Sequence, residues 1–239
     1  MSPLRKTALV AGVFYLLTFV SIPTLALYGP VKGANYILGA GPDTGAIVGG
    51  ILEIVVALAG ICTAVALYPV LKRQNEGVAL GFVASRVLEA GAMFAGVMCL
   101  LSVVSLRQAG AGAEALVTGH ALVVMYDRMF LISQSFIPAV NALLLGSLLY
   151  QSRLVPRALP LLGFIGAALL VAGDMAVLFG LIGQHAPSTA LIAIPIALWE
   201  FSLGVWLVLR GFKPSAITAL YSRPAGMDNA SVAPVPAVR

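Results

Sequence analysis

Two residues of opposite charge, Arg86 and Glu89, lie inside an apolar run of about thirty residues, 77–106. A run of this length can cross a membrane as a helix. A charge inside such a helix costs roughly 2.5 to more than 10 kcal/mol unless it has a partner or faces a cavity. Because residues three apart share one face of a helix, Arg86 and Glu89 can pair with each other. Their remaining hydrogen-bonding capacity is then available to other helices.

Four further polar side chains lie inside other apolar runs. At about 1.5 Å per residue from the inner end of each helix, Glu89, Asn141 and Glu200 lie about 17 Å deep, around the middle of a membrane. The same count puts Glu53 and Asp174 about 24 Å deep. Polar groups at matching depths on several helices would have no polar partners if they faced lipid. The sequence therefore predicts one polar core of six residues: Glu53, Arg86, Glu89, Asn141, Asp174 and Glu200.

The charge balance of this predicted core is uneven, with four carboxyl groups and one guanidinium. In a medium of low dielectric constant, four carboxylates cannot all be ionised beside a single cation. Either some of them carry a proton at neutral pH, or a cation or cationic ligand is present. Two interpretations stay open: the core is a structural ion pair with hydrogen bonds that join helices, or it is a site that binds or moves something.

No catalytic motif accompanies the polar core. Ser85 and Ser202 lie near carboxylates but have no histidine to activate them, so a nucleophilic triad is not predicted. The two histidines, His120 and His185, lie between apolar runs, and the spacing typical of zinc sites does not occur. We therefore expect no catalytic residue, no metal and no cofactor, and the sequence leans away from an enzyme.

The composition identifies the class of protein. Of the 239 residues, 60% are hydrophobic and 10% are charged, whereas soluble domains carry about 25% charged residues. Such a chain cannot cover a water-facing surface, so the bilayer is its expected partner. The net charge of +5 does not indicate a nucleic-acid-binding protein, because the basic residues lie at the ends of the apolar runs rather than in one patch.

The apolar runs predict an all-α, polytopic transmembrane bundle that forms one domain, residues 1–213. Loop residues separate the runs, and residues 214–239 carry no periodic apolar pattern, so a disordered cytoplasmic tail is expected there. The first run could also be a signal peptide cleaved after Thr24-Leu25-Ala26, but its length favours a retained span. The six predicted spans are residues 7–28, 45–70, 77–106, 128–150, 160–182 and 189–210.

Basic residues set the expected orientation. Six spans leave both termini on one side of the membrane, and ten lysine and arginine residues fall on that side against three on the other. Since cytoplasmic loops carry the excess of positive charge, both termini are predicted to be cytoplasmic.

Four segments together resemble a known family: RKTALVAGVFYLLTF, RVLEAGAMFAGVMCLLSVVSL, GSLLYQSRLVPRALPLLGFIGA and PIALWEFSLGVWLVLRGFKP. The chain is similar, over residues 4–214, to a family of bacterial multi-pass inner-membrane proteins described only as a domain of unknown function. The resemblance implies a location in the bacterial cytoplasmic membrane and no particular activity. The family's recognisable segments include Arg86, Glu89, Pro156, Pro160, Glu200 and Trp206.

Three functional hypotheses follow. The first is a structural or regulatory membrane protein whose polar core fixes helix packing. The second is a proton-linked transporter of a small solute or cation that uses Arg86, Glu89 and Glu200, with the ligand bound in the core of the bundle. The third is an intramembrane enzyme acting on a lipid, with Glu53, Glu89 or Asp174 as the acid or base. The sequence does not indicate whether there is a protein partner.

Overall fold

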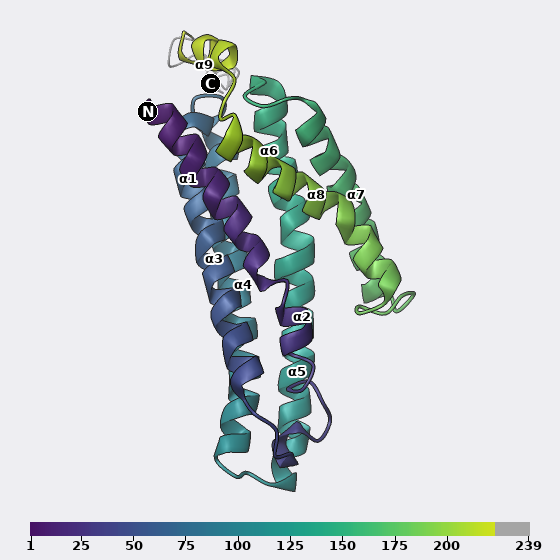
Figure 1. Ribbon diagram of the computed structural model, residues 1–239. Helices are drawn as coiled ribbons and strands as arrows, with labels where there is room; N and C mark the ends of the chain where they lie inside the picture. Colours follow the sequence, from purple (N-terminus) through teal and green to yellow (C-terminus); the bar gives the residue numbers. More distant parts are fainter. Residues whose placement is uncertain (223–239) are drawn as a thin grey trace, which may run out of the picture.

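The computed structural model describes residues 1–222, and all of the regular elements in that range are helices. Six helical segments are long and apolar enough to cross a membrane, which confirms the prediction of an all-α, multi-pass bundle. The N-terminus and the last described helix lie at the same end of the bundle (Figure 1). The six segments are Pro3–Leu27, Thr44–Leu71, Glu76–Gln108, Ala113–Ser152, Ala158–Leu178 and Pro187–Leu209.

The first segment is interrupted in the C-terminal part of its length. Helix α1, Pro3–Leu17, has Ser2 as its N-cap. The Ser2 side chain accepts a hydrogen bond from the Arg5 backbone nitrogen at 3.3 Å. A 3-10 turn, η1 (Thr18–Ser21), and the short helix α2 (Thr24–Leu27) follow. Pro23 lies between them and cannot donate a backbone hydrogen bond, so the α-helix does not continue through it.

A long hairpin forms the centre of the bundle. Helix α3, Thr44–Leu71, is followed by α4, Glu76–Gln108, which starts where the Asn75 side chain accepts from the Val78 nitrogen at 3.0 Å. The 33 residues of α4 span about 50 Å, more than the roughly 30 Å of a hydrocarbon core. The hairpin therefore extends beyond a bilayer at one end or both.

The fourth segment differs most from its predicted range. It was expected to begin at residue 128, but helical structure starts at Ala113 and runs through η3 (Ala113–Ala115), α5 (Leu116–Leu131) and α6 (Ile137–Ser152). A single π-helical turn, η4 (Ile132–Phe136), joins α5 to α6. Pro138 follows this turn and has no N–H to donate to it, which explains the local widening of the helix.

Helices α7 (Ala158–Leu178) and α8 (Pro187–Leu209) pack closely because glycines line their contact. A Cβ at Gly166 would lie 2.7 Å from the Ile196 nitrogen, and one at Gly163 would lie 2.8 Å from the Trp199 ring. Trp199 is fully buried and packs edge-on against Tyr15 of α1. These contacts attach the α7–α8 pair to α1. The end of the pair at the turn between α7 and α8 leans away from the long helices (Figure 1).

The segment after the sixth span also differs from the expected disordered tail. Pro214–Tyr221 form α9, which starts with proline at a position where a missing N–H costs nothing. Its Ala216 and Leu220, four residues apart, are buried against the bundle. The remaining part of the predicted tail, 223–239, lies outside the described residues.

Candidate functional site

Arg86 is at the centre of a group of polar side chains contributed by four helices. Its Nη1 donates to both oxygens of Glu89, at 2.9 and 3.2 Å, and its Nη2 donates to Glu200 Oε1 at 3.1 Å. The same Nη2 donates to the Tyr15 hydroxyl at 3.1 Å, and the guanidinium also lies over the Tyr15 ring. Asn141 completes the group by donating from Nδ2 to Glu89 Oε2 at 2.7 Å.

Each member reaches the group because of its place on a helix. Arg86 and Glu89 are three apart on α4 and therefore share one face, as the sequence predicts. Asn141 follows the π-helical turn on α6, and Glu200 lies on α8 one residue after the buried Trp199. We call Arg86, Glu89, Asn141, Glu200 and Tyr15 the arginine cluster.

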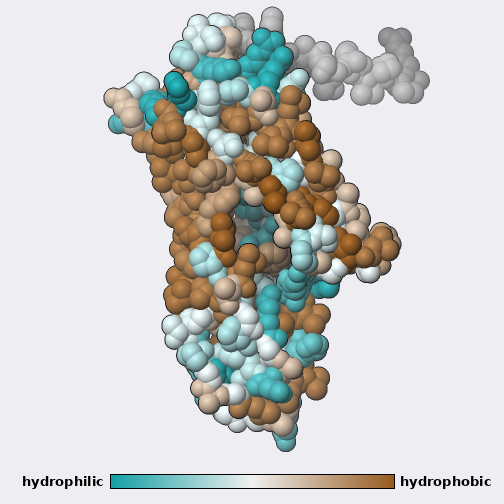
Figure 2. All heavy atoms as spheres, turned by 45° about the vertical axis from the view of Figure 1, so that its right-hand side comes forward, coloured by the Kyte–Doolittle hydropathy of each residue, from teal (hydrophilic) through white to brown (hydrophobic). Residues whose placement is uncertain are grey.

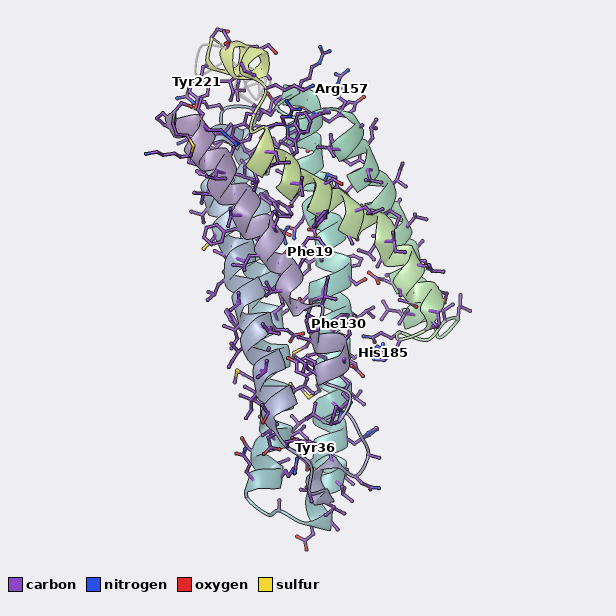
Figure 3. All side chains as sticks on the ribbon, viewed as in Figure 1. Phe19, Tyr36, Phe130, Arg157, His185 and Tyr221 are labelled. Atoms are coloured by element: carbon purple, nitrogen blue, oxygen red, sulfur yellow. The ribbon has the colours of Figure 1, made fainter. Side chains whose placement is uncertain are left out.

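A cavity of about 130 Å³ lies against the arginine cluster. The space-filling view shows a hollow at mid-height with hydrophilic side chains inside it and mostly hydrophobic residues around it (Figure 2). The interrupted first segment forms one wall of the cavity, and Phe19 marks that wall at the end of α1 (Figure 3). The lining residues are Thr18, Phe19, Ser21, Ile22, Val56, Ala57, Gly60, Arg86, Glu89, Ala90, Met93, Gln134, Pro138 and Glu200.

The cluster is buried but not closed to the cavity. Side-chain exposure is 4% for Arg86, 11% for Glu89 and 17% for Glu200, so the two acids are the more accessible members. Two carboxyl groups face one guanidinium there, which leaves an excess of acid. Two buried polar atoms, Arg86 Nε and Asn141 Oδ1, have no hydrogen-bond partner within the described residues. The site therefore has room and bonding capacity for a small polar ligand.

Glu53 occupies a different environment. It is fully buried on α3, where the Tyr126 hydroxyl donates to its Oε1 at 2.7 Å and Gln134 Nε2 donates to the same oxygen at 3.0 Å. Its other oxygen, Oε2, has no partner within the described residues, and Glu53 does not line the cavity. None of the ion pairs found in residues 1–222 includes Glu53.

Asp174 is also separate from the arginine cluster. Its Oδ1 accepts a hydrogen bond from Ser135 at 2.5 Å, and its Oδ2 is buried without a partner in the described part of the chain. Ser135 and Gln134 both belong to the π-helical turn η4. That turn therefore supplies one donor to Glu53 on α3 and the next to Asp174 on α7, and π-helical turns are frequent at functional sites.

The six residues predicted as one core thus fall into three places. Arg86, Glu89, Asn141 and Glu200 are joined by hydrogen bonds, whereas Glu53 and Asp174 each have neutral partners of their own. Sequence reasoning did not identify the hydrogen-bonding partners Tyr15, Tyr126, Gln134 and Ser135. A signal for two of them was present, because Ser133-Gln134-Ser135 is a polar run inside an apolar segment just before a proline.

Charged residues at the other end of the bundle form ion pairs of a different kind. Asp43 accepts from Arg107 Nη1 at 2.8 Å and from Gln108 Nε2 at 2.9 Å, and Tyr36 donates to it as well. The Tyr36 hydroxyl, the Gln108 amide and the nearby Arg107 hold the pKa of Asp43 below its usual range. Lys32 pairs with Asp127 at 2.7 Å.

Across residues 1–222, no group of three or more histidine, cysteine, aspartate or glutamate side chains lies together as a set of metal ligands.

Comparison with known proteins gives one match. The model of a family described as "Domain of unknown function (DUF4386)" matches residues 10–211, which include the whole arginine cluster. No curated protein and no solved structure matches the chain.

Proposed function

We propose that this chain, which belongs to the DUF4386 family of domains of unknown function, carries a small cation, or a small solute with a cationic group, across the membrane in exchange for protons. The ligand binds in the cavity beside the arginine cluster. Glu89 and Glu200 provide its negative charge, and Arg86 holds the two carboxylates in place.

The observation that carries this proposal is the excess of acid at the cavity wall. A buried ion pair offsets its desolvation cost only when its charges and remaining hydrogen-bonding groups are satisfied, and an uncompensated buried charge is strongly destabilising. Here Glu89 and Glu200 face a single guanidinium, and both line the cavity together with it. A bound cation or a proton would balance the second carboxylate.

The size and lining of the cavity restrict the ligand. A volume of about 130 Å³ is enough for a few water molecules and too small for a large solute. Phe19, Ile22, Val56 and Met93 give the rest of the wall an apolar character. A metal cation that keeps a few waters, or a small alkylammonium ion, fits both properties.

Coupling to protons follows from competition for the same oxygens. When one of the two carboxylates binds a proton, the cluster is electrically balanced and its attraction for a cation is lost. When the proton leaves, the net negative charge returns and favours the cation. Glu200 is the more exposed acid and binds Arg86 through one oxygen only, so its second oxygen is available.

The test measures binding by protein reconstituted in nanodiscs, using sodium and methylammonium as separate probes at pH 5.5 and pH 8. We expect methylammonium, sodium or both to bind more tightly at pH 8, and Glu200→Gln to weaken that binding about tenfold or more. Glu114→Gln is the matched control, because Glu114 is exposed and lies outside the cavity. Proteoliposomes with an imposed proton gradient then measure uptake of the bound probe.

The proposal is overturned if neither sodium nor methylammonium binds at pH 5.5 or at pH 8. So would equal binding by wild type and Glu200→Gln.

A structural role is the second candidate, and one observation favours it. The arginine cluster joins α1, α4, α6 and α8 through charged hydrogen bonds, which would fix the relative positions of these helices. If this is its whole role, replacing Arg86 and Glu89 together by glutamine changes stability little and no probe binds.

We also propose the bacterial cytoplasmic membrane as the location, with both termini in the cytoplasm. The support is the number of basic residues at the end of the bundle that carries the N-terminus, together with an even number of spans.

A further inference from the structure

A second pocket, larger than the first, lies at the end of the bundle that carries the N-terminus. It has a volume of about 490 Å³ and is formed where the turn between α6 and α7 meets the turn between α8 and α9. Figure 3 shows Arg157 at that end of the molecule, near the top of α6 and α7. The lining residues are Gln74, Gln151, Ser152, Arg153, Arg157, Lys213, Ser215, Ala216, Ala219 and Leu220.

The charged side chains that line this pocket from the described residues are all basic. They are Arg153, Arg157 and Lys213, and no acidic residue within 1–222 lines it. None of the three takes part in an ion pair within the described residues. Three cations that share a concave site without a neutralising acid repel one another, and an anion would relieve that repulsion.

Backbone hydrogen bonds and one ring contact position the turns that carry these basic residues. Arg153 adopts a left-handed conformation with φ 57°, and its N–H donates to the Leu149 oxygen at 3.0 Å. The Lys213 N–H donates to the Leu154 oxygen at 2.9 Å, which ties the two turns together. Arg157 lies over the Tyr150 ring at 4.7 Å. Backbone hydrogen bonds therefore hold the two turns together, and the Tyr150 ring holds the Arg157 side chain at the pocket.

The start of α9 adds neutral donors to the same pocket. Lys213 is the N-cap of α9, and its side chain makes no capping hydrogen bond. The first-turn N–H groups of Ser215 and Ala216 have no acceptor within the helix, and both residues line the pocket. Uncapped N–H groups next to arginine side chains are the combination that binds phosphate oxygens.

We propose that this pocket binds a phosphate group, carried either by an anionic phospholipid or by a small soluble phosphate. Arg153 and Arg157 contact the phosphate oxygens from the α6–α7 side, and Lys213 with the first turn of α9 contacts them from the other. Binding fixes α9 against the bundle, since Ala216 and Leu220 of α9 line the pocket and are buried between α9 and the bundle. This proposal is independent of the cation site at the arginine cluster.

The experiment follows thermal unfolding of the full chain in nanodiscs of three kinds. The first contains phosphatidylcholine only, the second adds phosphatidylglycerol, and the third is phosphatidylcholine with inorganic phosphate in the buffer. Because a ligand that binds only the folded state raises the midpoint, we expect a rise of several degrees with one phosphate source. A rise with phosphatidylglycerol alone identifies the lipid, and a rise with inorganic phosphate identifies a soluble ligand.

Matched variants connect the rise to the pocket. Arg153→Gln and Arg157→Gln should each remove most of it, while Arg157→Lys, which keeps the charge, should retain part. Lys6→Gln removes the same charge from an exposed residue of α1 outside the pocket, and should leave the rise unchanged. The proposal is overturned if neither source raises the midpoint, or if Lys6→Gln reduces the rise as much as the pocket variants do.

Discussion

Buried acids occur in two kinds of surroundings in this bundle. Those of the arginine cluster have a charged partner, and Glu53 and Asp174 have neutral ones. Glu89 and Glu200 share a guanidinium and line a cavity. Within residues 1–222, the donors to Glu53 are the neutral Tyr126 and Gln134, and the donor to Asp174 is the neutral Ser135. Both sites obtain hydrogen bonds, but only the first combines charge with accessible space.

This difference separates ligand binding from helix packing. A buried acid with neutral donors and no cation is suited to a protonated carboxyl group that links helices. An acid held by arginine beside a cavity remains able to accept a proton or a cation. The π-helical turn η4 connects the two regions, because Gln134 lines the cavity and also donates to Glu53.

The largest effect is expected from Arg86→Gln. Glu89 and Glu200 would lose their common cation, and leaving one partner of a buried ion pair alone costs about 3–5 kcal/mol. The free energy of unfolding in nanodiscs measures this loss. Replacing Glu89 by glutamine in the same chain should recover a substantial part of it, since the uncompensated acid is then removed. An unchanged stability for Arg86→Gln would mean that the cluster does not depend on the charge of the guanidinium.

A smaller effect should distinguish the two kinds of acid directly. Glu89→Gln removes a charged partner of Arg86 and should cost about 2 kcal/mol. Glu53→Gln keeps an oxygen that accepts from Tyr126 and Gln134, and should cost about 1 kcal/mol or less. Unfolding of the two variants under identical conditions measures both values. Equal losses would remove the distinction between charged and neutral sites.

The smallest effect is expected at Asp43, outside the membrane spans, where the acid is paired but accessible. Because its pKa is lowered in the folded state, Asp43 stabilises the protein above its unfolded pKa of about 3.9. That contribution is lost as the pH falls through the folded pKa. The thermal midpoint of wild type should therefore decline on acidification below about pH 4, and Asp43→Asn should show a shallower decline. Parallel profiles for the two proteins would contradict this.

Much of the fold follows from the sequence because the bilayer restricts what an apolar chain can do. Backbone groups inside hydrocarbon must bond within their own segment, so six long apolar runs become six helices. The range 45–70 matches Thr44–Leu71 closely for this reason. The start of the fourth segment at Ala113 was missed, since the residues before 128 are less apolar and α5 is stabilised by packing beyond the span. The helix α9 was missed because its stability also comes from packing against the bundle.

The sequence by itself determined that Arg86 and Glu89 share a helical face and that acids occur inside several spans. Only the tertiary structure decided which of these acids meet the arginine. Depth along a helix can be counted from the sequence, but rotation about its axis and the tilt of its neighbours depend on packing. Glycine contacts between α7 and α8 and the π-helical turn before Pro138 set those rotations. They bring Glu200 to Arg86 and give Glu53 and Asp174 neutral partners instead.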